Sequence, residues 1–144
     1  MSVGRILVIE DDCSVRNLLA ILLKGEGHQV VAVSDGNKGV AAYREDSFDL
    51  VLTDLFMPEK DGFEVITELT REFPEVKIVL MSGAGKHFSP SDFLPIALKL
   101  GAWQVLHKPF LLSDLEKVVD AAIGPATIPP VRGPDASSQT RDSY

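Results

Sequence analysis

Five short apolar runs, rich in β-branched residues, punctuate the chain without alternating between apolar and polar positions. They cover residues 5–9, 30–33, 50–54, 78–81 and 103–106. Short apolar runs bounded by turn residues are typical of buried strands. Strands that read as continuous apolar runs are typical of parallel sheets with helices on both faces. The pattern therefore predicts five parallel strands at the centre of the domain.

Helical periodicity fills the intervals between these runs. The apolar positions that repeat at helical spacing include Val15, Leu18, Leu19 and Leu22, then Val65, Ile66, Leu69 and Phe73, and finally Leu112, Leu115, Val118, Val119 and Ala122. The stretch 37–45 has the weakest apolar stripe. Regular alternation of strands and helices predicts an α/β fold, a doubly wound parallel sheet with right-handed crossovers.

The composition changes sharply after residue 123. The last 21 residues hold four of the nine prolines, together with Gly, Ser and Thr, and almost no large apolar side chains. A segment that cannot bury apolar surface remains disordered. We therefore expect one domain over residues 1–123, a Pro/Gly/Ser-rich disordered tail over residues 124–144, and no output domain.

Composition and charge narrow the class of function. The net charge is −7 and the 14 Lys and Arg residues are scattered. Direct binding to nucleic acid is disfavoured because it needs clustered cations. No apolar stretch approaches the roughly 18 residues of a membrane span, and no signal-peptide pattern opens the chain, so no membrane association is expected. The single cysteine, Cys13, suits a reducing compartment, and we expect a cytoplasmic protein.

Polar side chains stand at the carboxyl ends of the predicted strands. They are Asp11 and Asp12 after the first strand, Asp54 at the third, Ser82 at the fourth and Lys108 at the fifth. Ligands of open α/β sheets bind at this edge, so we expect these side chains to converge. Three neighbouring carboxylates need a cation or a proton, and oxygen ligands suit Mg²⁺. The ammonium and hydroxyl groups suit phosphoryl oxygens, and an Asp nucleophile can form an acyl phosphate.

An ordered set of short motifs resembles the receiver domain of a two-component response regulator, of the CheY-like superfamily. The motifs are Ile-Glu-Asp-Asp at 9–12, Asp-Leu-Phe-Met-Pro with Asp-Gly within 54–62, Met-Ser-Gly at 81–83, Gly-Ala at 101–102 and Lys-Pro-Phe at 108–110. The resemblance extends from the first predicted strand to the last predicted helix. It implies a flavodoxin-like (βα)₅ fold with the strand order 2-1-3-4-5.

The resemblance also implies roles for the acidic residues. Asp54 would accept a phosphoryl group from a sensor histidine kinase in a Mg²⁺-dependent reaction. Asp12 would bind Mg²⁺ directly and Asp11 through water, and the remaining protein ligands would be Asp54 and the backbone carbonyl of Phe56. The domain would signal through changed protein contacts. It would not be an enzyme, beyond catalysing its own phosphorylation and slow dephosphorylation.

Three further roles follow from the same resemblance. Lys108 would pair with Asp54 at rest and with the phosphoryl group afterwards, and Ser82 would swing in to bond a phosphoryl oxygen. Pro109 is expected to follow a cis peptide bond. His107 shows no spacing typical of metal ligands, and we expect it to be solvated or packed.

The chain departs from the family at the residue that rotates together with the switch hydroxyl, which here would be the hydroxyl of Ser82. Family members usually carry Tyr or Phe there, and this chain has Val105. Trp103 shares a face with Val105 if the strand is regular, because side chains alternate along a strand. Either Trp103 substitutes for the missing aromatic residue or the output surface responds differently.

A second departure is the segment 83–100, which is longer than usual and contains Pro90 and Pro95. Proline inside a helix removes a hydrogen bond and crowds the preceding turn. The prolines therefore predict a long loop followed by a shortened helix that begins near residues 93–95.

The expected partners are a sensor histidine kinase or phosphotransfer protein, and a downstream protein that binds the fourth and fifth strand–helix units. The sequence does not decide whether the chain forms a homodimer. One alternative is a phosphorelay intermediate or phosphate sink. A haloacid-dehalogenase-like phosphohydrolase would need a second Asp at the position of Phe56 and a substrate cap. Glu10, Asp11 and Asp12 would repel the phosphate of a flavodoxin-like cofactor, and the intact set of site residues disfavours a degenerate receiver.

Overall fold

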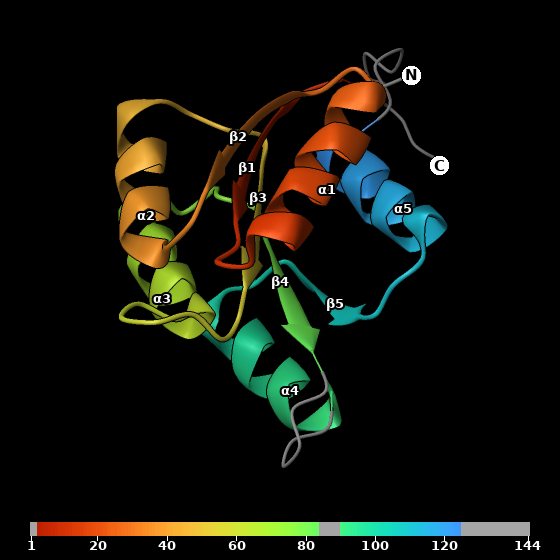
Figure 1. Ribbon diagram of the computed structural model, residues 1–144. Helices are drawn as coiled ribbons and strands as arrows, with labels where there is room; N and C mark the ends of the chain where they lie inside the picture. Colours follow the sequence, from red (N-terminus) through yellow and green to blue (C-terminus); the bar gives the residue numbers. More distant parts are fainter. Residues whose placement is uncertain (1–2, 84–89, 125–144) are drawn as a thin grey trace, which may run out of the picture.

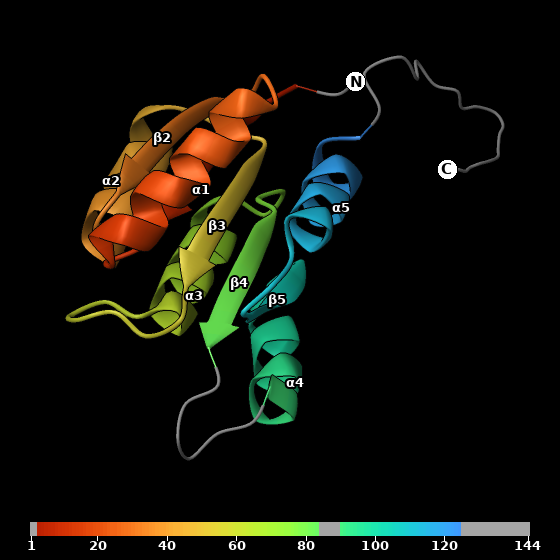
Figure 2. The same ribbon diagram turned by 45° about the vertical axis from the view of Figure 1, so that its right-hand side comes forward.

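The structure, a computed structural model, describes residues 3–83 and 90–124. The strands are β1 (Arg5–Ile9), β2 (Gln29–Val33), β3 (Leu50–Asp54), β4 (Ile78–Gly83) and β5 (Gln104–Lys108), and the helices are α1 (Cys13–Gly25), α2 (Gly36–Glu45), α3 (Gly62–Glu72), α4 (Pro90–Leu100) and α5 (Leu112–Ile123). All paired strands are parallel, in the order β2-β1-β3-β4-β5. This confirms the predicted flavodoxin-like doubly wound fold (Figures 1 and 2).

Helices cover both faces of the sheet, and each face has its own apolar core. On one face α2, α3 and α4 pack against strand residues such as Leu7, Val51 and Leu80. On the other face α1 and α5 pack against residues such as Val8 and Leu52. Successive residues of one strand therefore enter different cores, which explains why the strands read as continuous apolar runs.

Aspartates begin three of the helices. The side chains of Asp12, Asp35 and Asp61 each accept a hydrogen bond from a backbone N–H in the first turn of α1, α2 and α3. Asp61 forms a capping box with Glu64. Such caps satisfy amides that have no partner within the helix.

The prediction that the fourth helix begins near residues 93–95 is wrong. Helix α4 begins at Pro90 and contains Pro95. Pro90 stands in the first turn, where helix amides have no intrahelical partner, and Pro95 removes one hydrogen bond. Phe93 and Ala97 lie one turn apart and are both buried in the core under α3 and α4, which offsets that loss.

Trp103 does not share a face with Val105, contrary to the expectation from a regular strand. Strand β5 begins only at Gln104, and Trp103 lies in the preceding bend. Its ring packs on the core beneath α1 and α5, with Lys77 Nζ 5.6 Å from the ring centroid. Val105 packs on the opposite core. Trp103 therefore does not occupy the place of the missing switch aromatic residue.

Two predictions fall outside the described part of the chain: the loop over residues 84–89 and the tail over 125–144. The peptide bond between Lys108 and Pro109 is cis, as expected. Within residues 3–83 and 90–124, no helix has the length and apolar character needed to cross a bilayer.

Gly62, the first residue of α3, lies against the strand that ends at Asp54. A Cβ on Gly62 would sit 2.5 Å from the Asp54 carbonyl oxygen and 2.9 Å from Leu55 Cα, so the backbone would have to shift. We expect Gly62→Ala to lower the free energy of unfolding by about 1–3 kcal/mol, the usual cost of overpacking. Gly25, at the end of α1, has nothing within 4 Å of its Cβ position.

Urea denaturation of Gly62→Ala and Gly25→Ala measures this difference directly. The Gly25 variant should keep or slightly raise the stability, because Ala loses less conformational entropy in a helix than Gly does. Equal stabilities of the two variants would show that the close approach at Gly62 has no energetic consequence.

Candidate functional site

Three charged side chains meet at the carboxyl edge of the sheet, on the face covered by α1 and α5. Glu10 follows β1, Asp54 ends β3 and Lys108 ends β5. Lys108 Nζ lies 2.7 Å from Glu10 Oε1 and 3.2 Å from Asp54 Oδ1. The Glu10 side chain is 1% exposed, Asp54 13% and Lys108 24%. One ammonium therefore serves as the counter-ion of two nearly buried carboxylates.

Glu10 is fixed by contacts on all sides. Its Oε1 accepts the bond from Lys108, and its Oε2 accepts a hydrogen bond from the Asp12 backbone N–H at 3.2 Å. Its own N–H donates to the Val33 carbonyl, and its carbonyl accepts from Arg16 Nη1. The carboxylate thus holds the Lys108 ammonium at a set position beside Asp54.

Burial and charge shift the ionisation of this trio in defined directions. Burial raises the pKa of Asp54 above its usual range, although the ammonium of Lys108 opposes the shift. Burial also raises the pKa of Glu10, again against Lys108. Burial alone would lower the pKa of Lys108, but the bond to Glu10 and the charge of Asp54 outweigh it and raise that pKa. The lysine is therefore firmly cationic at neutral pH.

A third carboxylate completes an acidic group at this edge. One oxygen from each of Glu10, Asp11 and Asp54 lies within 4.8 Å of the others. Lys108 supplies a single positive charge for these three acids, so the group retains net negative charge when all are ionised. Oxygen-only donors of this kind suit a hard divalent cation that keeps several waters.

Asp12 is not one of the three carboxylates of this group, and its expected role as a direct Mg²⁺ ligand stays a prediction. Its Oδ1 accepts hydrogen bonds from the backbone N–H groups of Ser14 (2.9 Å) and Val15 (3.2 Å), which makes it the N-cap of α1. Glu10 takes the expected place in the acidic cluster. A count along β1 could have found it: Ile6, Val8 and Glu10 fall on one side of the strand, which is also the side of Asp54.

Ser82 lies on the other face of the sheet. It pairs in register with His107 of β5, and its Oγ is 3.3 Å from His107 Nδ1. Ser82 is 1% exposed, whereas His107 is exposed. The sequence predicted that Ser82 lies at the edge of the sheet. For His107 it predicted only a solvated or packed side chain, without a contact to Ser82. The register between β4 and β5, which creates the contact, leaves no local signal in the sequence.

Phe56 lies in the loop after Asp54, and its ring is half exposed. The ring meets Phe93 of α4 edge-on, with centroids 5.7 Å apart. This contact links the loop beside Asp54 to α4. The expected role of the Phe56 carbonyl as a metal ligand stays a prediction.

Comparison with known proteins defines the family. The model of the response regulator receiver domain matches residues 6–120, so this chain belongs to that family. The chain is 37% identical to the response regulator receiver protein CpdR of Brucella abortus over 123 residues, which covers 82% of this chain and 98% of CpdR. It is 35% identical to the transcriptional regulatory protein ZraR of Klebsiella oxytoca over 118 residues.

The match to ZraR covers only part of that protein. The chain spans about a quarter of the length of such transcriptional regulators, with 82% of this chain and 26% of ZraR covered. Among solved structures, a receiver domain protein from Clostridium thermocellum is 30% identical with a TM-score of 0.77, covering 83% of this chain and 94% of that one. CheY4 of Vibrio cholerae is 24% identical with a TM-score of 0.75, covering 84% and 99%, and supports the fold.

Family and geometry together place the chain in two-component signalling. It is a receiver domain, a signalling domain that accepts a phosphoryl group. The phosphohydrolase alternative gains no support from these comparisons.

The raised carboxyl pKa values predict a cost in stability at the site. A raised pKa means that the folded state favours the protonated carboxyl. The fold is therefore most stable, with respect to Asp54, at a pH below the unfolded-state pKa of about 4, and this stability is lost as the pH rises through the folded-state pKa. In a buffer without divalent cations, Asp54→Asn should raise the free energy of unfolding at pH 7 by about 1 kcal/mol.

Urea denaturation at pH 7 and at pH 3.5 checks this expectation, with the exposed Asp120 of α5 changed to Asn as a control. The gain of Asp54→Asn should shrink at the lower pH, and Asp120→Asn should stay within about 0.5 kcal/mol of the wild type at both. A gain that is independent of pH would contradict the electrostatic explanation.

Proposed function

We propose that Asp54 is the phosphoacceptor and that it takes its phosphoryl group from a phosphohistidine on a sensor kinase or phosphotransfer protein. The observation that carries this proposal is the pair formed by Lys108 with Asp54 at 3.2 Å, next to the acidic group. An Asp carboxylate in such a position can act as a nucleophile and form an acyl phosphate.

In the proposed reaction an ionised carboxylate oxygen of Asp54 attacks the phosphorus. A bond between that oxygen and phosphorus forms as the phosphorus–nitrogen bond breaks, and the imidazole leaves with the electron pair. Lys108 keeps Asp54 ionised beforehand and stabilises the charge on the phosphoryl oxygens afterwards. Glu10 retains the ammonium throughout, since its carboxylate is buried and held by Asp12 N–H and Lys108.

We propose Mg²⁺ as the cation of this site, held by Glu10, Asp11 and Asp54. Bound there, it would neutralise charge on the phosphoryl oxygens as the transfer proceeds. The donor set fits, because these three carboxylates exceed the one positive charge of Lys108 and offer only hard oxygen ligands.

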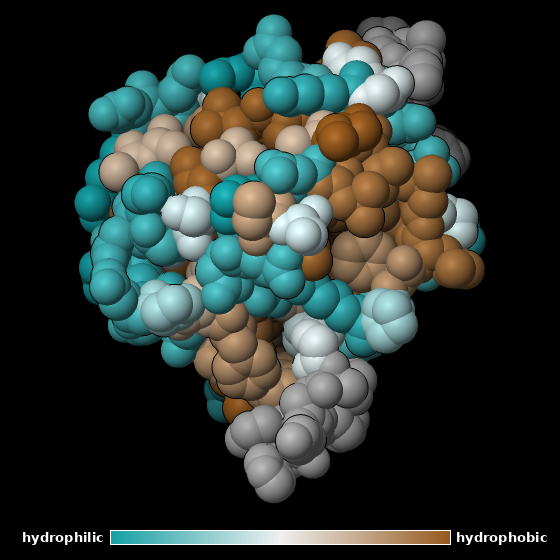
Figure 3. All heavy atoms as spheres, in the orientation of Figure 1, coloured by the Kyte–Doolittle hydropathy of each residue, from teal (hydrophilic) through white to brown (hydrophobic). Residues whose placement is uncertain are grey.

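The incoming partner must approach the rim around Lys108, and the surface beside it is apolar. A groove between α1 and α5 is lined by Val15, Leu18 and Phe110 together with Lys108 itself. Leu18 is 55% exposed, and Figure 3 shows hydrophobic side chains gathered over these two helices. We propose that the kinase or phosphotransfer protein covers this groove, because it is continuous with the site.

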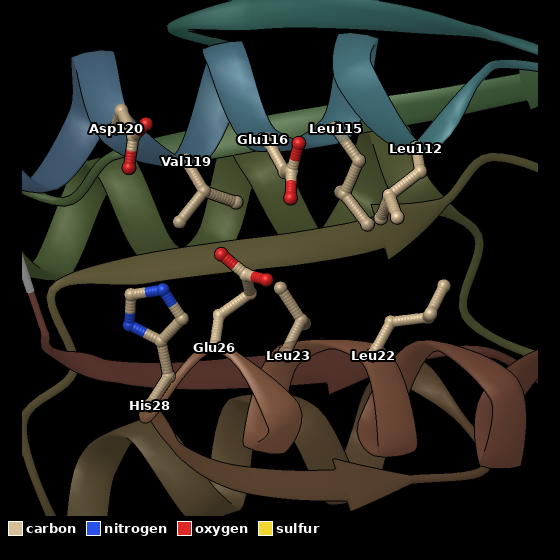
Figure 4. A pocket seen from close by; sticks show the side chains of 9 residues that line it. All are labelled: Leu22, Leu23, Glu26, His28, Leu112, Leu115, Glu116, Val119 and Asp120. Carbon is tan, nitrogen blue, oxygen red and sulfur yellow. The ribbon is translucent and has the colours of Figure 1, made fainter.

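Farther along the same two helices the surface becomes acidic. Figure 4 shows Leu22 and Leu112 facing one another at one end of a hollow, Glu26 and Glu116 nearer its middle, and Asp120 with His28 at the other end. A partner that covers the apolar groove and also meets these carboxylates would complement them with Lys or Arg. The hollow contains none of the acidic group around Asp54, so its role would be recognition.

The output is proposed to run through the fourth and fifth strand–helix units. The phosphoryl group biases a two-state equilibrium when Ser82 moves toward it. Helix α4 exposes Leu94, Ile96 and Leu98, an apolar surface available to a downstream protein. A cytoplasmic location remains our proposal, resting on the single unpaired cysteine, Cys13.

The proposed ligand set makes a sharp prediction for the two adjacent aspartates. Mg²⁺ binds only the folded protein, so it should raise the thermal unfolding midpoint of the wild type. Asp11→Asn should abolish most of that increase, because it removes a ligand. Asp12→Asn should keep it, because Asn caps a helix as well as Asp does.

Thermal unfolding midpoints of the wild type and of each variant, measured with and without Mg²⁺, test this prediction. The same measurement with Ca²⁺ provides a second divalent cation. Asp12→Ala serves as a further control: it should lose about 0.5–2 kcal/mol of stability through the missing cap, yet keep the response to Mg²⁺. Loss of the Mg²⁺ response in Asp12→Asn, with a normal response in Asp11→Asn, would restore the ligand set predicted from the sequence.

The proposed acceptor role is tested by incubation with acetyl phosphate and Mg²⁺, followed by intact-mass measurement. The wild type should gain the mass of one phosphoryl group, and Asp54→Ala should gain none. Lys108→Met should be phosphorylated at least tenfold more slowly, as expected when one positioned charge is lost. No adduct on the wild type, or an adduct that persists in Asp54→Ala, contradicts the proposal.

A further inference from the structure

The Ser82 hydroxyl lies on the face of the sheet opposite to Asp54, where it cannot bond a phosphoryl group on that residue. Along β4, Leu80 packs on the core beneath α3 and α4 and Met81 on the opposite core, so Ser82 follows the side of Leu80. Glu10, Asp54 and Lys108 follow the other side. A Ser82 hydroxyl that bonds a phosphoryl oxygen on Asp54 must therefore turn across the end of its own strand.

The hydrogen bond to His107 opposes that movement. Ser82 Oγ and His107 Nδ1 are 3.3 Å apart, and the two residues are neighbours in the β4–β5 register. In the described part of the chain, His107 is the side chain that bonds this hydroxyl. Val105, the nearest residue of β5 on that face, is aliphatic and offers no alternative bond.

We propose that His107 is a positioning residue, which holds the Ser82 hydroxyl away from Asp54 until a phosphoryl group is present. This inference rests on the proposed role of Asp54. The resting bond is lost when Ser82 turns, so phosphoryl binding has to outweigh it. His107 thereby lowers the affinity of the site for a phosphoryl group through Ser82, without touching the group itself.

The same bond connects the site to the surface. Ser82 is buried, whereas His107 is exposed on β5, in the region proposed to contact the downstream partner. When Ser82 turns away, the imidazole loses its bond and is released to other contacts. By linkage, a partner that binds the released imidazole strengthens phosphoryl binding by the same factor. His107 thus supplies the connection that Trp103, on the other face, does not.

A double-mutant cycle between His107 and Ser82 tests this proposal on the full chain. The probe is beryllofluoride, a stable mimic of a phosphoryl group on Asp, titrated in the presence of Mg²⁺ and followed by the backbone amide signals of residues 82 and 83 in NMR spectra. His107→Val removes the bond. His107→Asn can retain it, because the Asn amide reaches the position of the imidazole Nδ1.

His107→Val should bind beryllofluoride about two- to tenfold more tightly than the wild type, as expected when a typical hydrogen bond no longer has to be broken. His107→Asn should bind close to the wild-type affinity. In the Ser82→Ala background, His107→Val should change nothing, because no hydroxyl remains to be released. A role of His107 that is only structural would act equally in both backgrounds.

Two results overturn the proposal: an unchanged affinity in His107→Val, or the same change in both backgrounds. Either result leaves the role of Asp54 intact as long as the wild type binds beryllofluoride and Asp54→Ala does not. Failure of the wild type to bind contradicts the proposed function itself. The two failures are therefore distinguishable within one set of titrations.

Discussion

The ammonium of Lys108 between Glu10 and Asp54 is the interaction on which this site depends. It joins the ends of β1, β3 and β5, and the bond from Lys108 to Glu10 links residues 98 positions apart in the chain. Removing this shared ammonium would leave two nearly buried carboxylates without compensation, and such a loss typically costs about 3–5 kcal/mol. The parallel order of the strands is what brings the three ends to one edge. The site therefore exists only when the sheet has this strand order.

Much of this arrangement follows from the sequence. The central strands β1, β3 and β4 are covered on both faces, so they were visible as nearly uninterrupted apolar runs. The edge strands β2 and β5 are partly exposed, and their shorter apolar runs were still sufficient to predict them. Polar residues at the carboxyl ends of the strands then predicted that Asp54 and Lys108 would meet, and the structure places them 3.2 Å apart. The strand order came from the resemblance to receiver domains, since local patterns do not contain it.

Prediction and structure differ where a shift of one residue along the chain changes what a side chain contacts. Strand β1 ends at Ile9, so Glu10 already stands at the edge, and Asp12 is left to cap α1. Trp103 was placed by strand periodicity, yet β5 begins one residue later. The contact between Ser82 and His107 depends on register between strands, which no local pattern reveals. Pro95 was predicted to interrupt the helix, but the burial of Phe93 and Ala97 on α4 offsets the hydrogen bond that Pro95 removes.

The resting state is thus a balance of opposing charges, with the switch hydroxyl held apart from it. In this resting state Lys108 is the shared counter-ion that keeps two desolvated carboxyls ionised. Carboxyl carbon NMR shifts of Glu10 and Asp54, followed against pH without divalent cations, test this in the wild type and in Lys108→Met. Both carboxyls should titrate at higher pH in Lys108→Met, since the ammonium lowers the pKa of each. Unchanged titration of both carboxyls would contradict this role of Lys108.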